Sequence, residues 1–141
     1  MDTIQVKGTV HLKVYKSGEL IEDTVQNNLV VNVGKQSLAR LLGSGDITKR
    51  VINIGFGTAS TPAAGSQTGL ENNFSKVLDG VTYAGTSASF QFTLGESENN
   101  GVTIREFGLI SADNTLFSRI VRNPIAKTSD IRLEGVWSIT F

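Results

Sequence analysis

Apolar and polar residues alternate along most of this chain, and the N-terminal segment shows the pattern most clearly. Its apolar residues share one parity: Ile4, Val6, Val10, Leu12 and Val14. A period of two is typical of a strand with one buried face. Gly8 falls on the same parity, which indicates a bulge or the close approach of another segment. Residues 16–19 have turn composition, so residues 20–26 are predicted to return as the second strand of a hairpin.

The alternation recurs through the rest of the chain. It predicts two strands within 74–94 and single strands at 50–57, 102–110, 115–121 and 131–141. Residues 111–114 have the composition of a hairpin turn. The last strand reaches the final residue, so we expect the C-terminal end to be held in a sheet.

One helix is predicted between these strands. Asn32 is a suitable N-cap, and Gly43 stands where a glycine would end a helix. The residues of one face have helical spacing: Val33, Ser37, Leu38, Leu41 and Leu42. Gly34 lowers the helix propensity. A helix of about ten residues is too short to be stable alone, so it must pack on the rest of the protein.

These elements, about seven or eight strands and one short helix, predict a mainly β protein. Turns rather than helices separate the strands, which favours an antiparallel β-sandwich over a parallel sheet. A chain of 141 residues makes about one ordinary domain. We therefore expect residues 1–141 to form a single β-sandwich domain, in which residues 1–26 form an N-terminal hairpin.

Composition narrows the classes of function. The chain has 13 basic and 13 acidic residues. Proteins that coat nucleic acid or bind anionic membranes work through a basic field, so neither partner is expected. The absence of cysteine excludes disulfides, thiol catalysis and thiolate metal sites. No run approaches the roughly 18 apolar residues of a membrane span, and no signal peptide is expected at the N-terminus.

The only histidine, His11, limits the catalytic chemistry that the chain can perform. A Ser-His-Asp triad would have to use it, and a metal site built from several histidines is excluded. His11 lies on the polar parity of the first strand, so we interpret it as a solvent-facing residue. We predict that the protein is not an enzyme and has no catalytic, cofactor-binding or metal-binding residue.

A glycine-rich turn closes the strand at 50–57. Gly55-Phe56-Gly57-Thr58 is similar to a phosphate-binding turn. It lacks the Gly-Lys-Ser/Thr ending of a P-loop and the third glycine of the dinucleotide fingerprint. No helix follows it to hold a phosphate. We interpret it as a strand that leaves the sheet through flexible glycines.

Two clusters of oxygen-bearing side chains would suit a calcium ion. The first lies in a polar loop: Glu96, Glu98, Asn99 and Asn100. The second is weaker: Glu71, Asn72 and Asn73. Neither has the spacing of an EF-hand loop, so solvated loops are the favoured interpretation.

A protein that hydrolyses or binds glycans is another class of function to consider. Any two of the acidic residues would supply the carboxylate pair of a glycosidase. A sugar cleft also needs exposed rings, whereas most aromatic residues lie on apolar parities and are interpreted as core: Phe90, Phe92, Trp137 and Phe141. Tyr15 and Tyr83 are the candidates for exposed rings.

Arg105 and Glu106 interrupt an apolar strand, which indicates either a buried or interfacial ion pair or a bulge, and we favour the bulge.

The loops 58–69 and 95–101 are long and polar for so small a domain. Long loops on a rigid sandwich are often contact surfaces, so these two indicate an interaction role.

Several runs resemble segments of tailed-bacteriophage structural proteins. They are NLVVNVGKQSLARLL at 28–42, INIGFGT at 52–58, TGLEN at 68–72, VTIREFGLI at 102–110 and DNTLFSR at 113–119. In this order they resemble the amino-terminal domain of phage tail-collar and tail-fibre proteins, and small virion proteins related to it. The resemblance covers roughly residues 28–141.

The resemblance implies a non-enzymatic virion structural protein, assembled in the cytoplasm of the host bacterium. It implies a tail or baseplate adaptor, or a fibre-attachment component. The expected partners are other virion proteins and copies of the chain itself, in a trimer or hexamer. The alternatives are a decoration protein of the capsid head and a carbohydrate-binding module for host recognition. The hairpin at 1–26 is the candidate for reaching a neighbouring subunit by strand addition.

Overall fold

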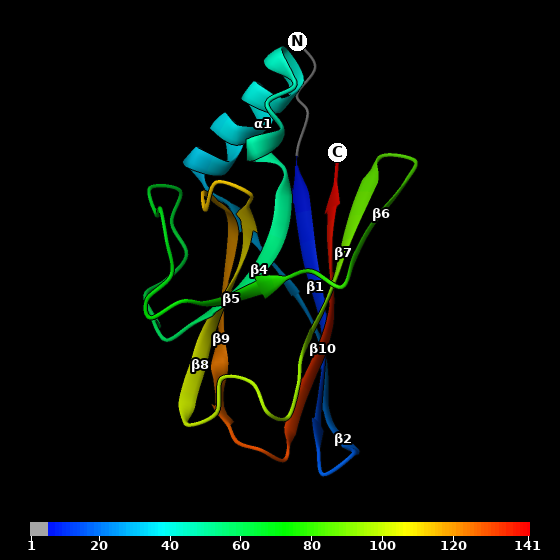
Figure 1. Cartoon of the computed structure of the whole chain (residues 1–141), viewed down its shortest axis with the longest axis vertical. Coiled ribbons are helices and arrows are strands. Elements are labelled where there is room, and N and C mark those ends of the chain that lie inside the picture. Colours follow the sequence, from blue (N-terminus) through cyan, green and yellow to red (C-terminus); the bar gives the residue numbers. More distant parts are fainter. Residues whose placement is uncertain (1–5) are drawn as a thin grey trace. The chain divides into compact units, whose positions relative to one another are not determined.

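The protein, in a computed structural model that describes residues 6–141, is mainly β. Two antiparallel five-stranded sheets and one α-helix make up the described part of the chain (Figure 1). The predicted fold class, the antiparallel sheets of a β-sandwich with one short helix, is confirmed. In the described residues the strands exceed the expected number for two reasons. The short β3 (Leu29–Val30) was not predicted, and residues 74–94 form three strands rather than two, among them the short β5 (Phe74–Val77) and β6 (Gly80–Ala84).

The chain folds into two compact units. Unit 1 comprises Met1–Asn28, Leu78–Gly101 and Lys127–Phe141, and unit 2 comprises Leu29–Val77 and Val102–Ala126. The chain therefore passes from one unit to the other at four places. The organisation of residues 1–141 as a single domain stays a prediction.

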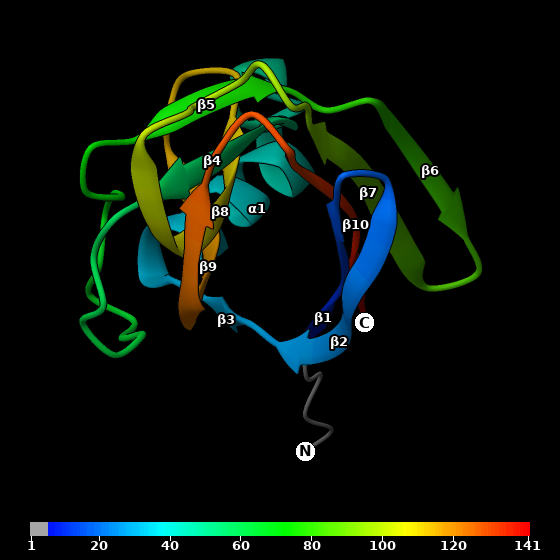
Figure 2. The same cartoon turned by 90° about the horizontal axis from the view of Figure 1, so that it is seen from below.

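Unit 1 contains a sheet with the strand order β2-β1-β10-β7-β6 (Figure 2). Its longer strands are β1 (Lys7–Lys16), β2 (Glu19–Asn27), β7 (Ser87–Leu94) and β10 (Ile131–Thr140). The predicted N-terminal hairpin is confirmed as β1 and β2. Ser17 and Gly18 both have positive φ, 50° and 80°, as a two-residue hairpin turn of type I′ requires.

One face of this sheet carries the core of unit 1. It is formed by alternate residues of three neighbouring strands: Val10, Leu12, Val14, Phe90, Phe92, Leu94, Leu133, Trp137 and Ile139. Val10, Leu12 and Val14 are buried as predicted, whereas Val6 precedes β1 and is only partly buried, and Ile4 lies outside the described residues. Phe141 is wrong as a core residue, because it follows the last strand and stays about half exposed.

Two glycines of unit 1 are explained by close approaches. A Cβ on Gly8 would lie 1.7 Å from Asn28 Oδ1, while the pairing of β1 with β10 stays regular, so Gly8 marks an approach and not a bulge. Gly135 of β10 is opposite Phe92 of β7. The ring of Phe92 lies over this glycine and fills the place of the missing side chain.

Unit 2 contains a sheet with the strand order β3-β9-β8-β4-β5. Its longer strands are β4 (Val51–Gly57), β8 (Val102–Ser111) and β9 (Leu116–Lys127). Buried residues include Ile54, Ile104, Leu109 and Leu116. Phe56 and Phe107 pack edge to face, with ring centroids 5.1 Å apart.

The turn between β8 and β9 lies at the predicted residues 111–114. The carboxylate of Asp113 accepts hydrogen bonds from the hydroxyls of Ser111 (2.5 Å) and Thr115 (2.8 Å), and it pairs with the ammonium of Lys49. The bond from Lys49 is the main reason why the pKa of Asp113 lies well below its usual range. This carboxylate therefore closes the turn in its charged form.

The helix α1 (Asn32–Ser44) is present, but its ends differ from the prediction. Val31 occupies the N-cap position without a side-chain cap, and Gly45, not Gly43, takes the left-handed conformation at the C-terminus. The helix buries Gly34 and Ser37. A short 3₁₀-helix, η1 (Ile47–Lys49), follows it.

Candidate functional site

The most constrained polar site in the described residues is a buried ion pair in unit 2. Glu106 of β8 and Arg119 of β9 are 0% and 2% exposed. Glu106 Oε1 accepts a hydrogen bond of 2.7 Å from Arg119 Nε. Its second oxygen, Oε2, accepts bonds from the backbone N–H groups of Ala59 (2.8 Å) and Glu71 (2.9 Å). The carboxylate of Glu106 thus binds Arg119 on the neighbouring strand β9 and both ends of the loop that follows β4.

Arg119 binds the middle of the same loop. Its Nη1 donates hydrogen bonds to the carbonyl of Thr61 and to Oε1 of Gln67, both at 2.9 Å. The ends of the loop are also joined directly, because Thr58 N donates to Glu71 O at 3.0 Å and Thr58 Oγ1 to Glu71 Oε1 at 2.7 Å. We call the Glu106–Arg119 pair with these loop contacts the hub.

The hub corrects two interpretations of the sequence. The bulge at Arg105 and Glu106 is wrong, since Glu106 pairs in regular register with Gly57 and the irregularity of this ladder lies between Val51 and Asn53. The alternative of a buried ion pair is right, with Arg119 as the partner. Arg105 itself only approaches the carbonyl of Thr58, at 3.5 Å.

The glycines at the end of β4 serve close packing rather than flexibility. A Cβ on Gly57 would lie 2.5 Å from Glu106 Oε2. A Cβ on Gly55 would lie 2.5 Å from Asn73 Oδ1. Neither glycine has a positive φ. The glycine-rich turn therefore makes room for the hub and for the returning loop.

The structure also shows what the two clusters of oxygen-bearing side chains contact. Asn72 Nδ2 donates to Thr58 Oγ1 at 3.2 Å, so it joins Glu71 in closing the loop of the hub. In unit 1, Asn100 Oδ1 accepts a hydrogen bond of 2.7 Å from Lys127 Nζ. Asn72 and Asn100 are exposed to solvent, as the interpretation as solvated loops expects, and these hydrogen bonds hold their side chains in place. Within residues 6–141, no three His, Asp or Glu side chains form a group that would hold a metal ion.

Lys127 is a buried cation that sequence reasoning missed. Its ammonium donates to three oxygens, those of Asn100 Oδ1, the Glu96 carbonyl (3.3 Å) and the Thr128 carbonyl (3.1 Å). Burial lowers the pKa of Lys127, and nearby carboxylates, led by that of Glu96, oppose this effect. An ammonium therefore occupies the centre of the polar loop at 95–101. The available signal was that Lys127 shares the parity of buried Ile125.

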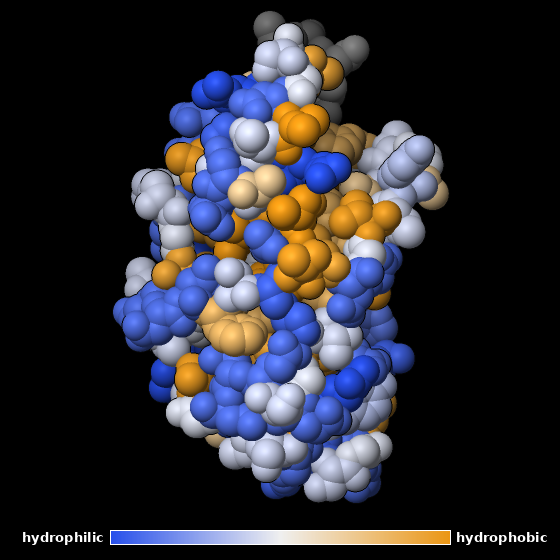
Figure 3. All heavy atoms as spheres, viewed as in Figure 1, coloured by the Kyte–Doolittle hydropathy of each residue, from blue (hydrophilic) through white to orange (hydrophobic). Residues whose placement is uncertain are grey.

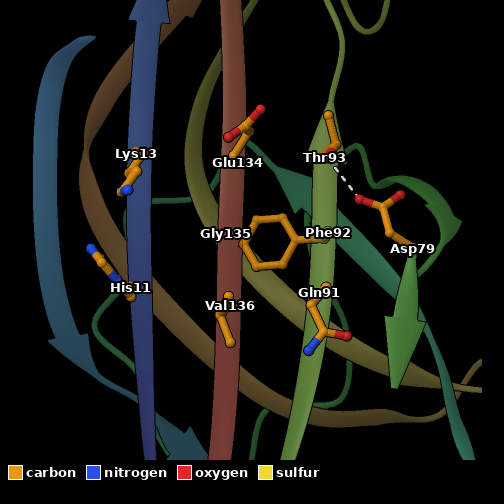
Figure 4. A pocket seen from close by; sticks show the side chains of 9 residues that line it. All are labelled: His11, Lys13, Asp79, Gln91, Phe92, Thr93, Glu134, Gly135 and Val136. Carbon is orange, nitrogen blue, oxygen red and sulfur yellow. Dashed lines mark hydrogen bonds between the residues drawn. The ribbon is translucent and has the colours of Figure 1, made fainter. Parts of the chain in front are cut away.

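His11 lies on the exposed face of the unit 1 sheet, as predicted. Its Nε2 is 2.5 Å from Asp23 Oδ1 on the neighbouring strand. A shallow hollow of about 300 Å³ begins beside it on this face (Figure 4). The hollow is lined by His11, Lys13, Asp79, Gln91, Phe92, Thr93, Glu134, Gly135 and Val136. Thr93 Oγ1 donates to Asp79 Oδ2 at 2.7 Å, so this hydroxyl and carboxylate are held together at one side.

Apolar side chains reach the surface among polar ones (Figure 3). Among the described residues, the large apolar side chains that are at least half exposed are Ile21, Val25, Leu42, Ile47, Val77, Val81 and Tyr83. Tyr83, one of the two tyrosines expected at the surface, is 88% exposed. None of the helices within residues 6–141 combines the length and apolar character needed to cross a bilayer.

Comparison of the chain with protein-family models, curated proteins and solved structures found no match. A function is therefore inferred from the residues and contacts of the chain itself.

Proposed function

We propose that this chain is a non-enzymatic structural protein of a tailed-phage virion, which acts at the tail or baseplate as an adaptor or fibre-attachment component. The observation that carries the proposal is the hub. Removing a carboxylate and a guanidinium from water costs several kcal/mol per ion. Here both ions are used to fix a loop, 58–71, whose residues are largely exposed. A loop held so firmly offers a rigid surface to a protein partner.

The runs that resemble phage tail proteins converge on this hub. Gly57 belongs to the run at 52–58, Glu71 to the run at 68–72, Glu106 to the run at 102–110 and Arg119 to the run at 113–119. These residues lie far apart in the sequence and contact one another in space. Four of the five runs thus contribute a residue to the fixing of the loop. This supports the resemblance as more than a chance pattern.

The predicted assembly arm needs a different test from a deletion. β1 lies between β2 and β10, and its buried residues include Val10 and Leu12. Removing residues 1–26 would therefore damage the core of unit 1. If the hairpin adds to a neighbouring subunit, it does so through the outer edge of β2, and substitutions on that strand are the appropriate probe.

The direct experiment is to look for the chain in particles. Tailed-phage particles from a lysate of cells that carry the gene for the chain are purified on a density gradient and probed with an antibody against the chain. The proposal expects the chain to sediment with tailed particles and immunogold label to lie on the tail. Label on the head would support the decoration protein instead. A chain found only in the soluble cell fraction would contradict both virion roles.

A second candidate, a carbohydrate-binding module, is favoured by the hollow beside His11. Its lining carries hydrogen-bond donors and acceptors suited to sugar hydroxyls, among them Lys13, Asp79 and Glu134. The ring of Phe92 is buried against Gly135 and gives no stacking surface. A glycan array with the native chain and the Asp79→Asn variant tests this function. Binding that the substitution abolishes supports it, and an array without signal rejects it.

A further inference from the structure

The two edge strands of the unit 1 sheet differ in how they are protected against pairing. β2 carries Glu19, Glu22 and Asp23, and its pairing with β1 has a register shift between Val14 and Tyr15. Charges and bulges are the usual means by which proteins prevent an edge strand from pairing with another chain. β6, at the opposite edge, has neither.

β6 has the sequence Gly-Val-Thr-Tyr-Ala and pairs regularly with β7 along its whole length. It contains no charged residue and no proline. Val81 and Tyr83 are 51% and 88% exposed, although their side chains share the face on which Phe90 is buried. In the described part of the chain, β6 thus has one paired edge and one open edge beside large exposed apolar side chains.

The sequence of β6 is complementary to itself in an antiparallel pair. If two copies meet across a two-fold axis at Thr82, each Thr82 faces the other. Val81 of each copy then faces Tyr83 of the other, and Gly80 faces Ala84. Aromatic with β-branched pairs and Thr–Thr pairs are among the cross-strand pairs that stabilise antiparallel sheets. A two-fold axis at the middle residue of β2 would instead place Asp23 opposite the Asp23 of the second copy, and like charges directly opposite destabilise a sheet.

We propose that β6 is a self-association edge, which pairs with β6 of a second copy of the chain across a two-fold axis at Thr82. The pairing joins two five-stranded sheets into one continuous sheet through an isologous contact. The inference rests on the residues of β6 and holds whether or not the protein belongs to a virion. A two-fold contact fits a dimer or a hexamer built from dimers, and it does not by itself build a trimer.

The chain has no cysteine, so a single introduced thiol reports on one contact. In the Thr82→Cys variant the two thiols would face each other, and Cα atoms of facing residues in antiparallel strands are about 4.5–5.5 Å apart, within the range of a disulfide. After mild oxidation we expect a covalent dimer on a non-reducing gel. Val25→Cys on β2 is the matched control, since Val25 is also exposed on an edge strand. A dimer from Val25→Cys equal to that from Thr82→Cys would overturn the proposal.

A charge exchange tests the register without a covalent bond. Sedimentation equilibrium of the native chain should show a dimer that forms with rising concentration. Thr82→Lys and Thr82→Glu should each raise the dissociation constant by about tenfold or more, because like charges face each other. An equimolar mixture of the two variants should recover the dimer. The proposal fails if the native chain stays monomeric up to about 1 mM, or if the mixture associates no better than either variant. Circular dichroism confirms that the variants are folded.

Discussion

At the scale of single residues, each compact unit uses a buried charge to hold a polar loop. In unit 2 the charge of Arg119 is balanced by Glu106, and both ions bind the loop backbone. In unit 1 the ammonium of Lys127 binds neutral oxygens, with carboxylates only nearby. The first arrangement compensates charge with charge. The second compensates the ammonium of Lys127 with the dipoles of neutral oxygens, so the stability of this site depends on the protonation of the lysine itself.

Glu106→Gln tests the ion pair at constant shape. The amide leaves the guanidinium of Arg119 buried without its counter-charge, and breaking a buried pair in this way costs about 3–5 kcal/mol. We expect a loss of that size in the free energy of unfolding measured in urea. Glu134→Gln is the matched control, because Glu134 pairs with Arg132 at the surface and such pairs contribute little. Equal losses in the two variants would contradict the role of the hub.

Lys127→Met tests the buried ammonium through pH. Burial lowers the folded-state pKa of Lys127 below its ordinary value of 10.5, so the unfolded chain binds the proton more readily. Stability rises with pH wherever the unfolded state binds more protons. The free energy of unfolding of the native chain, minus that of the variant, should therefore increase as the pH rises from neutral toward 10.5.

Urea unfolding at several pH values measures this difference. Lys35→Met on the exposed surface of α1 is the control for removing a lysine charge. A difference between the native chain and Lys127→Met that stays flat, or falls with pH, would contradict the assignment.

Sequence reasoning reached only part of these sites. Arg105 and Glu106 were recognised as unusual because two charges interrupt an apolar strand, but the partner of Glu106 lies on another strand, and no local pattern names it. Lys127 lies between the predicted strands at 115–121 and 131–141, where solvent exposure of a lysine is the rule, and only tertiary packing buries it. The hub and the lysine site therefore depend on contacts between segments that sequence periodicity does not connect.

At the scale of elements, α1 shows why a poor helix residue occupies a helix. Gly34 lies against the backbone of Phe117 on β9, and a Cβ there would be 2.1 Å from the carbonyl oxygen. The glycine that weakens the sequence prediction is thus what lets the helix approach the sheet. Gly43 of the same helix makes no such contact, because nothing lies within 4 Å of a Cβ built on it.

The two glycines of α1 form a matched pair of tests. Gly43→Ala should stabilise the protein by roughly 0.5–1 kcal/mol, since alanine is the better helix residue and the site is open. Gly34→Ala gains the same propensity but forces helix and strand apart, with a net loss of about 1–3 kcal/mol. Thermal unfolding followed by circular dichroism measures both. Stabilisation by Gly34→Ala would show that the approach to Phe117 is not tight.

Most strands and the helix were predictable from the sequence, and the errors of the prediction have physical causes. Long strands that bury one face, such as β1 and β10, alternate cleanly and were found. β5 and β6 are short and lie at sheet edges, where the alternation of buried and exposed residues weakens, so the segment 74–94 was assigned too few strands. The end of α1 was placed early because Gly43 and Gly45 both fit a terminal glycine, and only backbone geometry separates them.

At the scale of the whole molecule, the chain passes four times between its two compact units. Neither unit is one continuous piece of sequence: unit 1 is built from three segments and unit 2 from two. Each core therefore needs segments that are far apart in the sequence and are separated by residues of the other unit. We therefore predict a single cooperative unfolding transition rather than two. The only tryptophan, Trp137, is fully buried in unit 1 and reports on that unit alone.

The Glu106→Gln variant makes this prediction measurable, because Glu106 belongs to unit 2. If the units unfold together, a weaker hub must lower the urea midpoint seen by Trp137 fluorescence as much as the midpoint seen by far-ultraviolet circular dichroism, which averages over all strands. Coincident curves, shifted equally, are the expected result. A fluorescence midpoint that stays at the native value while the circular dichroism curve splits would mean that unit 1 stands without unit 2. Connectivity through four crossings would then not be enough to couple the two cores.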